Sequence, residues 1–129
     1  MGDLRLHEGE LNVMELLWSN KELAARDIAK IIKEYVGWEK NTTYTVINRL
    51  IDKGAITRKD PGFVCVAAVT KKAVRDTETK HLLDQFYNGN LSTFFNEYLK
   101  EQKLTRSEVV ELSKIVNDNT IGNNKFLKI

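Results

Sequence analysis

The sequence predicts a mainly α-helical protein, in which three helices are followed by one β-hairpin and then by further helices. Two observations predict this class. Apolar residues recur at helical spacing on both sides of one short stretch, residues 55–69, where β-branched residues surround a Pro-Gly turn. The chain also has 129 residues, 42% of them hydrophobic, which suits one or two small globular domains. We expect two domains, residues 1–69 and residues 70–129.

Two amphipathic helices are predicted at the start of the chain. The first spans Glu8 to Trp18, and its inward positions are Leu11, Val13, Met14, Leu17 and Trp18. The second spans Leu23 to Tyr35, and its inward positions are Ile28, Ile31, Ile32 and Tyr35. The second helix starts without a good N-cap, because Ala24 and Ala25 stand where Ser, Thr or Asp is usual.

The third helix, Trp38 to Gly54, has two unlike faces. Its apolar stripe consists of Thr43, Val46, Ile47, Leu50 and Ile51. Its opposite face carries Asn41, Tyr44, Thr45, Asn48, Arg49 and Asp52. Gly54 is expected to end the helix, and either Glu39 or Asn41 can cap its start.

The polar face of this third helix differs from an ordinary solvated face. It carries short hydrogen-bonding side chains instead of Lys/Glu pairs. Thr, Asn and Arg can meet base edges and phosphates, and small side chains let a helix lie deep in a groove. The face therefore favours contact with DNA, while a solvated surface with some threonines stays the simpler alternative.

A β-hairpin is predicted after Gly54. Its strands are Ala55–Lys59 and Phe63–Val69, and Asp60-Pro61-Gly62 forms the turn. Three helices followed by a hairpin is the order of a winged helix-turn-helix, in which the third helix enters the major groove and the hairpin, the wing, touches flanking backbone. Although the net charge is only +2, residues 38–59 carry five basic and two acidic residues. Arg58 and Lys59 are the candidate phosphate contacts of the wing.

The second half of the chain is predicted to be helical. The expected helices are Lys71–Tyr87, Leu91–Leu99 and one that starts at the capping box of Thr105, with a frayed polar tail from Asn117. Helices of this length cannot enclose a good core, so we expect a helical dimerisation domain. The alternative is that its aromatic residues pack on the N-terminal domain. The candidate dimer contacts are Leu82, Leu83, Phe86, Phe94, Phe95, Tyr98, Leu99, Leu112 and Ile115.

The sequence gives little support to an enzyme. Its two histidines, His7 and His81, lie far apart, and it has no Gly-rich phosphate loop or paired-carboxylate motif. His81 could sense pH or metal, or be an ordinary helix residue. A single cysteine, Cys65, forms no disulfide or metal cluster. We expect no enzymatic activity, no cofactor, no metal, no membrane insertion and a cytoplasmic location.

Several segments carry a resemblance to a known family. The runs are EGELNVMELLW, TTYTVINRLIDKG, FYNGNLSTFFNEYL and LTRSEVVEL, within Glu8 to Val116. Together they resemble the BlaI/MecI/CopY family of bacterial transcriptional repressors, of the penicillinase-repressor type. The resemblance implies a homodimer whose winged helices read a palindromic operator in double-stranded DNA, with TACA/TGTA-type dyads in relatives. It also implies that Thr42, Tyr44 and Thr45 match recognition-helix positions that contact DNA.

Four departures from the family pattern bear on function. Asn41 stands where relatives often have a basic residue, and the second wing strand reads VCVAAV, where relatives often place an aromatic and polar residues. The tail has no cysteine, so the copper sensing of one branch is not expected. In the β-lactam branch a membrane sensor protease cuts the C-terminal helices. The matching bond lies at Asn96, Glu97 and Tyr98, a candidate cleavage region in which Glu97 interrupts the Asn-Phe of relatives.

The rival to a DNA-binding repressor is a winged-helix protein-interaction module that binds no DNA.

Overall fold

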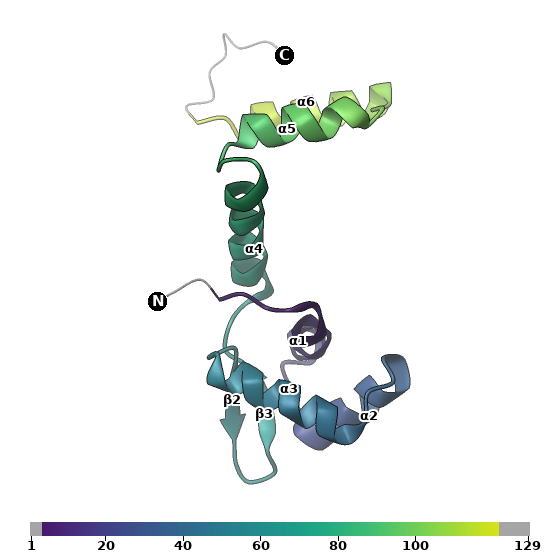
Figure 1. Ribbon diagram of the computed structural model, residues 1–129, viewed down its shortest axis with the longest axis vertical. Coiled ribbons are helices and arrows are strands. Elements are labelled where there is room, and N and C mark those ends of the chain that lie inside the picture. Colours follow the sequence, from purple (N-terminus) through teal and green to yellow (C-terminus); the bar gives the residue numbers. More distant parts are fainter. Residues whose placement is uncertain (1–3, 122–129) are drawn as a thin grey trace. The chain divides into compact units, whose positions relative to one another are not determined.

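Six helices and three strands are formed by residues 4–121, the part of the chain that the computed structural model describes (Figure 1). The chain divides into two compact units, with the division between Leu82 and Leu83. The predicted class, a mainly helical chain with a winged helix-turn-helix and a C-terminal helical region, is confirmed. The elements in order are α1 (Glu8–Asn20), β1 (Glu22–Ala24), α2 (Ala25–Tyr35), α3 (Lys40–Asp52), β2 (Ile56–Lys59), β3 (Val64–Ala67), α4 (Lys71–Phe86), α5 (Leu91–Glu101) and α6 (Arg106–Asp118).

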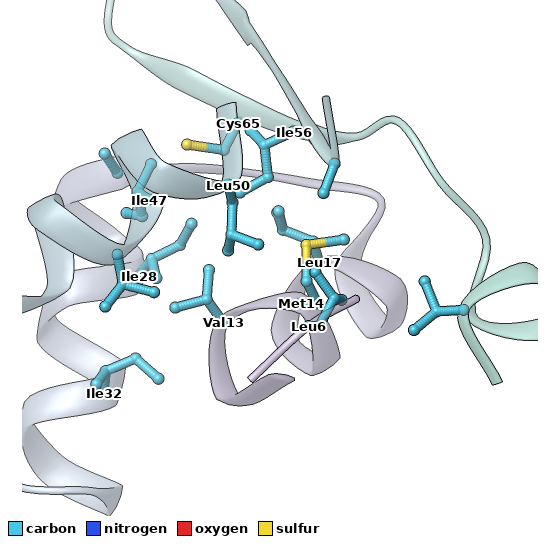
Figure 2. Packing of buried hydrophobic residues seen from close by; sticks show 14 residues of the cluster. Leu6, Val13, Met14, Leu17, Ile28, Ile32, Ile47, Leu50, Ile56 and Cys65 are labelled. Carbon is cyan, nitrogen blue, oxygen red and sulfur yellow. The ribbon is translucent and has the colours of Figure 1, made fainter. Parts of the chain in front are cut away.

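The hydrophobic core of the first unit lies between α1, α2, α3 and the hairpin. Figure 2 shows apolar side chains from each of these elements meeting in one cluster. Because each helix is amphipathic, one stripe of it is removed from water while its other face stays solvated. α4 adds Val74 to the same cluster. The most deeply buried apolar side chains are Val13, Met14, Leu17, Ala25, Ile28, Ile47, Leu50, Ala55 and Cys65.

The sheet has a third strand that the sequence did not predict. The second helix was expected to begin at Leu23, but Glu22–Ala24 form the strand β1. This strand pairs antiparallel with β3, and the order of strands in the sheet is β1-β3-β2. Leu23 lies opposite Cys65 in this register. The expectation was wrong because a three-residue strand is too short to show alternation, and its partner lies far away in the chain.

The end of α2 corrects a second expectation. Tyr35 was expected to face inward, but its side chain is 80% exposed. It lies on the same side of the helix as Ile28 and Ile32, which are buried. The apolar periodicity therefore extends one turn beyond Ile32, the last buried residue of α2. The expected absence of a side-chain cap at Ala24 is confirmed.

The ends of α3 and α6 follow the predicted capping chemistry. Glu39 is the N-cap of α3, so the earlier of the two predicted starts holds, and Gly54 has φ of +82° just past the helix. At α6 the Thr105 Oγ1 accepts from the Glu108 N–H at 3.1 Å, and a Glu108 carboxylate oxygen accepts from the Thr105 N–H at 2.9 Å. α6 continues to Asp118, so the fraying expected from Asn117 is wrong for its first residues. The rest of the expected tail, residues 122–129, lies outside the described residues.

The second unit has little interior of its own. No residue of α5 or α6 is fully buried. Its aromatic side chains cluster around Phe94, whose ring centroid lies 5.1 Å from Tyr87, 5.1 Å from Phe95 and 5.5 Å from Tyr98. Within residues 4–121, no helix is both long and apolar enough to cross a lipid bilayer.

Candidate nucleic-acid interface

α3 separates its buried and exposed side chains by face. Thr43, Val46, Ile47 and Leu50 are buried against the rest of the first unit. The exposed positions include five of the six candidate contacts of the helix, and the sixth, Tyr44, is half-buried. The exposed five are Asn41, Thr42, Thr45, Asn48 and Arg49. Because one stripe anchors α3 firmly, the opposite face is held out to solvent as a rigid row of short polar groups.

The hydroxyl of Thr45 is oriented by the helix itself. Its Oγ1 donates to the Asn41 carbonyl oxygen at 2.9 Å, a bond typical of threonine within a helix. The donated hydrogen leaves the lone pairs of the oxygen directed to solvent. Thr45 is therefore suited to accept a hydrogen bond or to present its methyl group to a base.

An aromatic contact joins α3 to the hairpin. The Tyr44 and Phe63 rings meet edge to face, with centroids 5.7 Å apart and planes at 65°. On the helix side, Lys40 Nζ lies 5.7 Å from the centre of the Tyr44 ring. On the hairpin side, Arg58 Cζ lies only 3.6 Å from the centre of the Phe63 ring. These four side chains form a continuous row in which the two rings lie between the two cations.

Both candidate cations of the wing are held in ion pairs. Arg58 Nε donates to both carboxylate oxygens of Asp60, each at 3.1 Å. Lys59 Nζ lies 3.1 Å from Oε1 of Glu22, which is on β1, the opposite edge strand of the sheet. All four side chains are largely exposed, and exposed ion pairs are worth about 1 kcal/mol or less. Neither ion pair is therefore strong enough to keep its cation from contacting a phosphate.

The buried pair between Glu10 and Lys53 fixes the C-terminal end of α3. Lys53 Nζ lies 2.7 Å from Glu10 Oε1 and donates to the Arg5 carbonyl oxygen at 3.0 Å. Glu10 is only 1% exposed and also accepts from the His7 N–H at 2.8 Å. Burial, the largest influence, raises the pKa of Glu10, but the His7 N–H and the Lys53 ammonium together lower it below its ordinary value. The carboxylate is thus charged near neutral pH.

Cys65 is a core residue. It is fully buried in β3, and burial raises the pKa of its thiol to about 11, although the nearby charge of Arg58 acts in the opposite direction. A thiol at this pKa is neutral and unreactive at physiological pH. Within the described part of the chain, no three His, Cys, Asp or Glu side chains gather closely enough to bind a metal ion.

The candidate dimer contacts are spread over α4, α5 and α6. Those that are exposed are Leu82, Phe86, Phe95, Tyr98, Leu112 and Ile115. Those that are half-buried are Leu83, Phe94 and Leu99. The candidate cleavage residues Asn96, Glu97 and Tyr98 are exposed on the helix α5, and His81 is half-buried in α4.

Phe63 and Asp60 were not singled out by the sequence. Phe63 was predicted only as the first residue of a strand, but it lies in the turn region and contacts both Tyr44 and Arg58. An aromatic residue next to a turn, beside a basic strand, is the signal that could have drawn attention to it. The contact with Tyr44 could not be found this way, since it joins segments that are distant in the chain.

A short hairpin with two cations lies beside a helix that presents a polar face, and this combination defines a winged helix-turn-helix protein of the class used by transcriptional regulators. The chain belongs to the penicillinase repressor family, whose sequence profile matches residues 6–118. It is therefore a DNA-binding transcriptional repressor and not an enzyme.

Individual relatives match along almost their whole length. The penicillinase repressor of Bacillus licheniformis is 26% identical over 116 residues, which cover 88% of this chain and 91% of that protein. The methicillin resistance regulatory protein MecI of Staphylococcus aureus (strain N315) is 26% identical over 114 residues, covering 87% of this chain and 93% of that protein. The penicillinase repressor of Staphylococcus aureus is also 26% identical, over 111 residues.

Proposed function

We propose that this protein represses transcription as a homodimer that binds a palindromic operator, with α3 of each subunit in the major groove. The observation that carries the proposal is the exposed row of short polar side chains on α3, backed by a buried apolar stripe on the same helix. Such a helix can approach base edges closely without giving up its packing. Asn41, Thr42, Tyr44, Thr45, Asn48 and Arg49 are the proposed contacts.

The wing supplies backbone contacts in this proposal. Arg58 and Lys59 lie on β2, within one short hairpin, and their present partners are exposed carboxylates. Both cations gain from contact with DNA phosphates, because such contact releases counterions and because arginine can bind a phosphate through two hydrogen bonds. The wing cations therefore contribute affinity that is independent of sequence.

The C-terminal helices supply the dimer contact. α5 and α6 bury no residue completely, and Phe86 is 71% exposed, Ile115 50% and Phe95 42%. Apolar side chains at this density on one small unit favour a second copy of the chain as their partner. Two recognition helices at a fixed spacing then gain the affinity that a single winged helix lacks.

Release from DNA is proposed to involve cleavage by a sensor protease at Asn96, Glu97 or Tyr98. These residues are exposed, but they lie in the middle of the helix α5. Local opening of the helix must precede cleavage, because proteases act on locally unfolded backbone. Cleavage here would divide the dimer region and so lower the affinity for DNA.

Selection of bound sites from a pool of random duplex DNA tests the proposal. We expect an inverted repeat, with half-site centres about one helical turn apart or a multiple of that distance. Light scattering with and without the selected duplex gives the number of subunits bound. A pool that stays random, or an enriched site bound by one subunit, would count against a dimeric operator-binding repressor.

The rival, a winged-helix module that binds only proteins, requires an apolar outer face on α3. Tyr44 is the one large ring among the exposed and half-buried positions of this helix, and it is already engaged by Phe63. The polar face therefore favours DNA over a protein partner.

A further inference from the structure

We propose that Phe63 is a positioning residue for DNA binding: its ring holds the Arg58 guanidinium at a fixed place beside the recognition helix α3. This inference rests on the proposed role of Arg58 as a phosphate contact. It assigns to Phe63 a role in recognition that is separate from packing the core.

The first step is the contact between the cation and the ring. Arg58 Cζ lies 3.6 Å from the Phe63 ring centre, which is within the range of direct stacking of a guanidinium on an aromatic face. A free arginine side chain on an exposed strand samples many rotamers, and ordering it on binding costs entropy. Stacking on the ring reduces that cost before DNA arrives.

The second step is the attachment of the ring to the rest of the domain. The Phe63 ring packs edge to face with the ring of Tyr44, which lies on α3. The Phe63 carbonyl oxygen accepts from the Ala25 N–H at 2.9 Å, at the first turn of α2, where the N-cap Ala24 provides no side-chain bond. Phe63 also has φ of +49°, a left-handed conformation that is unusual for a bulky residue. Both contacts hold the residue in this conformation, so its ring is fixed relative to both helices of the helix-turn-helix.

The third step concerns the atoms that remain for DNA. Asp60 accepts both of its hydrogen bonds from Nε of Arg58. This ion pair therefore does not consume the terminal amino groups Nη1 and Nη2, which can donate to a phosphate in a bidentate manner. The Phe63 ring and Asp60 together orient the guanidinium. The contact between Tyr44 and Phe63 then fixes the distance between α3 and the phosphate contact of the wing.

The test is a double-mutant cycle between Phe63→Leu and Arg58→Ala, with affinity measured on a mixed-sequence duplex of about 30 base pairs, long enough for two half-sites. Leucine keeps the apolar bulk and removes the aromatic face. We expect Phe63→Leu to weaken binding about threefold to tenfold and to lower the salt slope, as Arg58→Ala does. In the Arg58→Ala background, Phe63→Leu is expected to have no further effect.

Lys59→Ala is the matched control. Lys59 is on the same strand but is paired with Glu22 and is not stacked on Phe63. The effects of Phe63→Leu and Lys59→Ala should therefore add. Phe63→Trp keeps an aromatic face and should restore binding toward the wild-type value.

A further arm leaves Phe63 intact and so does not depend on the folding of Phe63→Leu. Arg58→Lys keeps the charge but loses the planar group that stacks and donates in pairs, and we expect it to lose most of what Arg58→Ala loses. Wild-type affinity for Phe63→Leu or Arg58→Lys, or additivity between Phe63→Leu and Arg58→Ala, would overturn the positioning role alone. If the wild-type protein bound no duplex even at low salt, the proposed function would fail as well.

Discussion

Lys53 Nζ lies 2.7 Å from Glu10 Oε1, and this contact ties the end of the recognition helix to the first turn of α1. Glu10 is almost completely buried, and its second oxygen, Oε2, has no hydrogen-bond partner among the described residues. Lys53 is therefore the main counter-charge of a carboxylate that cannot reach water. The position of α3 depends on a charged pair as well as on its apolar stripe.

Replacing Lys53 with methionine is expected to destabilise the fold by about 3 kcal/mol, because it leaves the Glu10 carboxylate buried without its counter-charge. This is the lower end of the usual range, since the Lys53 side chain is 27% exposed. Urea unfolding followed by circular dichroism measures the change. Lys33→Met is the matched control. Lys33 pairs with Glu39 at 3.2 Å, but both side chains are more than half exposed, so a loss within about 0.5 kcal/mol is expected. Equal losses for the two variants would contradict the importance of the buried pair.

The same pair makes stability depend on pH. Although burial raises the pKa of Glu10, hydrogen bonds from His7 and Lys53 lower it below the ordinary value of 4.5. A carboxylate with a lowered pKa stabilises the fold above its unfolded pKa, and this contribution is lost as the pH falls through the folded value. The free energy of unfolding should therefore fall below about pH 4.5 more steeply in the wild type than in Glu10→Gln. Urea titrations of both proteins across this range measure the difference, and parallel pH profiles would show that Glu10 does not contribute.

Substitutions on the polar face of α3 are expected to weaken specific DNA binding without unfolding the protein. Thr45→Ala or Asn48→Ala should weaken operator binding by about 1–3 kcal/mol, because each removes a group that meets a base edge. Thr79→Ala is the control, since Thr79 Oγ1 donates to Arg75 O at 2.9 Å in α4, the same local bond that Thr45 makes in α3. A gel-shift titration measures affinity. Unchanged affinity for both α3 variants would remove these side chains from the interface.

The Cys65 thiol is expected to react slowly with thiol reagents while the protein is folded. Its thiol is fully buried and its pKa is raised to about 11 by burial, so little thiolate is present or accessible near neutral pH. Because Cys65 is the one cysteine in the chain, mass spectrometry after iodoacetamide treatment reports on it alone. Modification should be slow in buffer and fast in urea. Equal rates in the two conditions would show that β3 opens readily.

The sequence predicted the elements whose residues are close together in the chain. The stripe of Thr43, Val46, Ile47 and Leu50 follows from helical periodicity alone, and the Thr105 capping box follows from two residues three apart. Such features depend on local geometry, so they can be seen without a fold. For the same reason the exposed polar face of α3 could be anticipated residue by residue.

The features that the sequence missed depend on contacts between distant segments. Strand β1 forms by pairing with β3, where Leu23 lies opposite Cys65. Glu10 was not singled out from the sequence, yet the fold buries it and brings Lys53 to it. The row formed by Tyr44, Phe63 and Arg58 likewise needs α3 and the hairpin to be placed first. Its role in binding is a proposal that the sequence alone did not suggest.

The most direct test of the central claim compares the sites selected from random duplex DNA by the wild-type protein and by Asn48→Ala. If α3 of each subunit reads the major groove, the wild type should enrich an inverted repeat, and the variant should lose preference at one position, symmetrically in both halves. No enriched site for the wild type, or an identical site for both proteins, would contradict the claim that this face of α3 reads DNA.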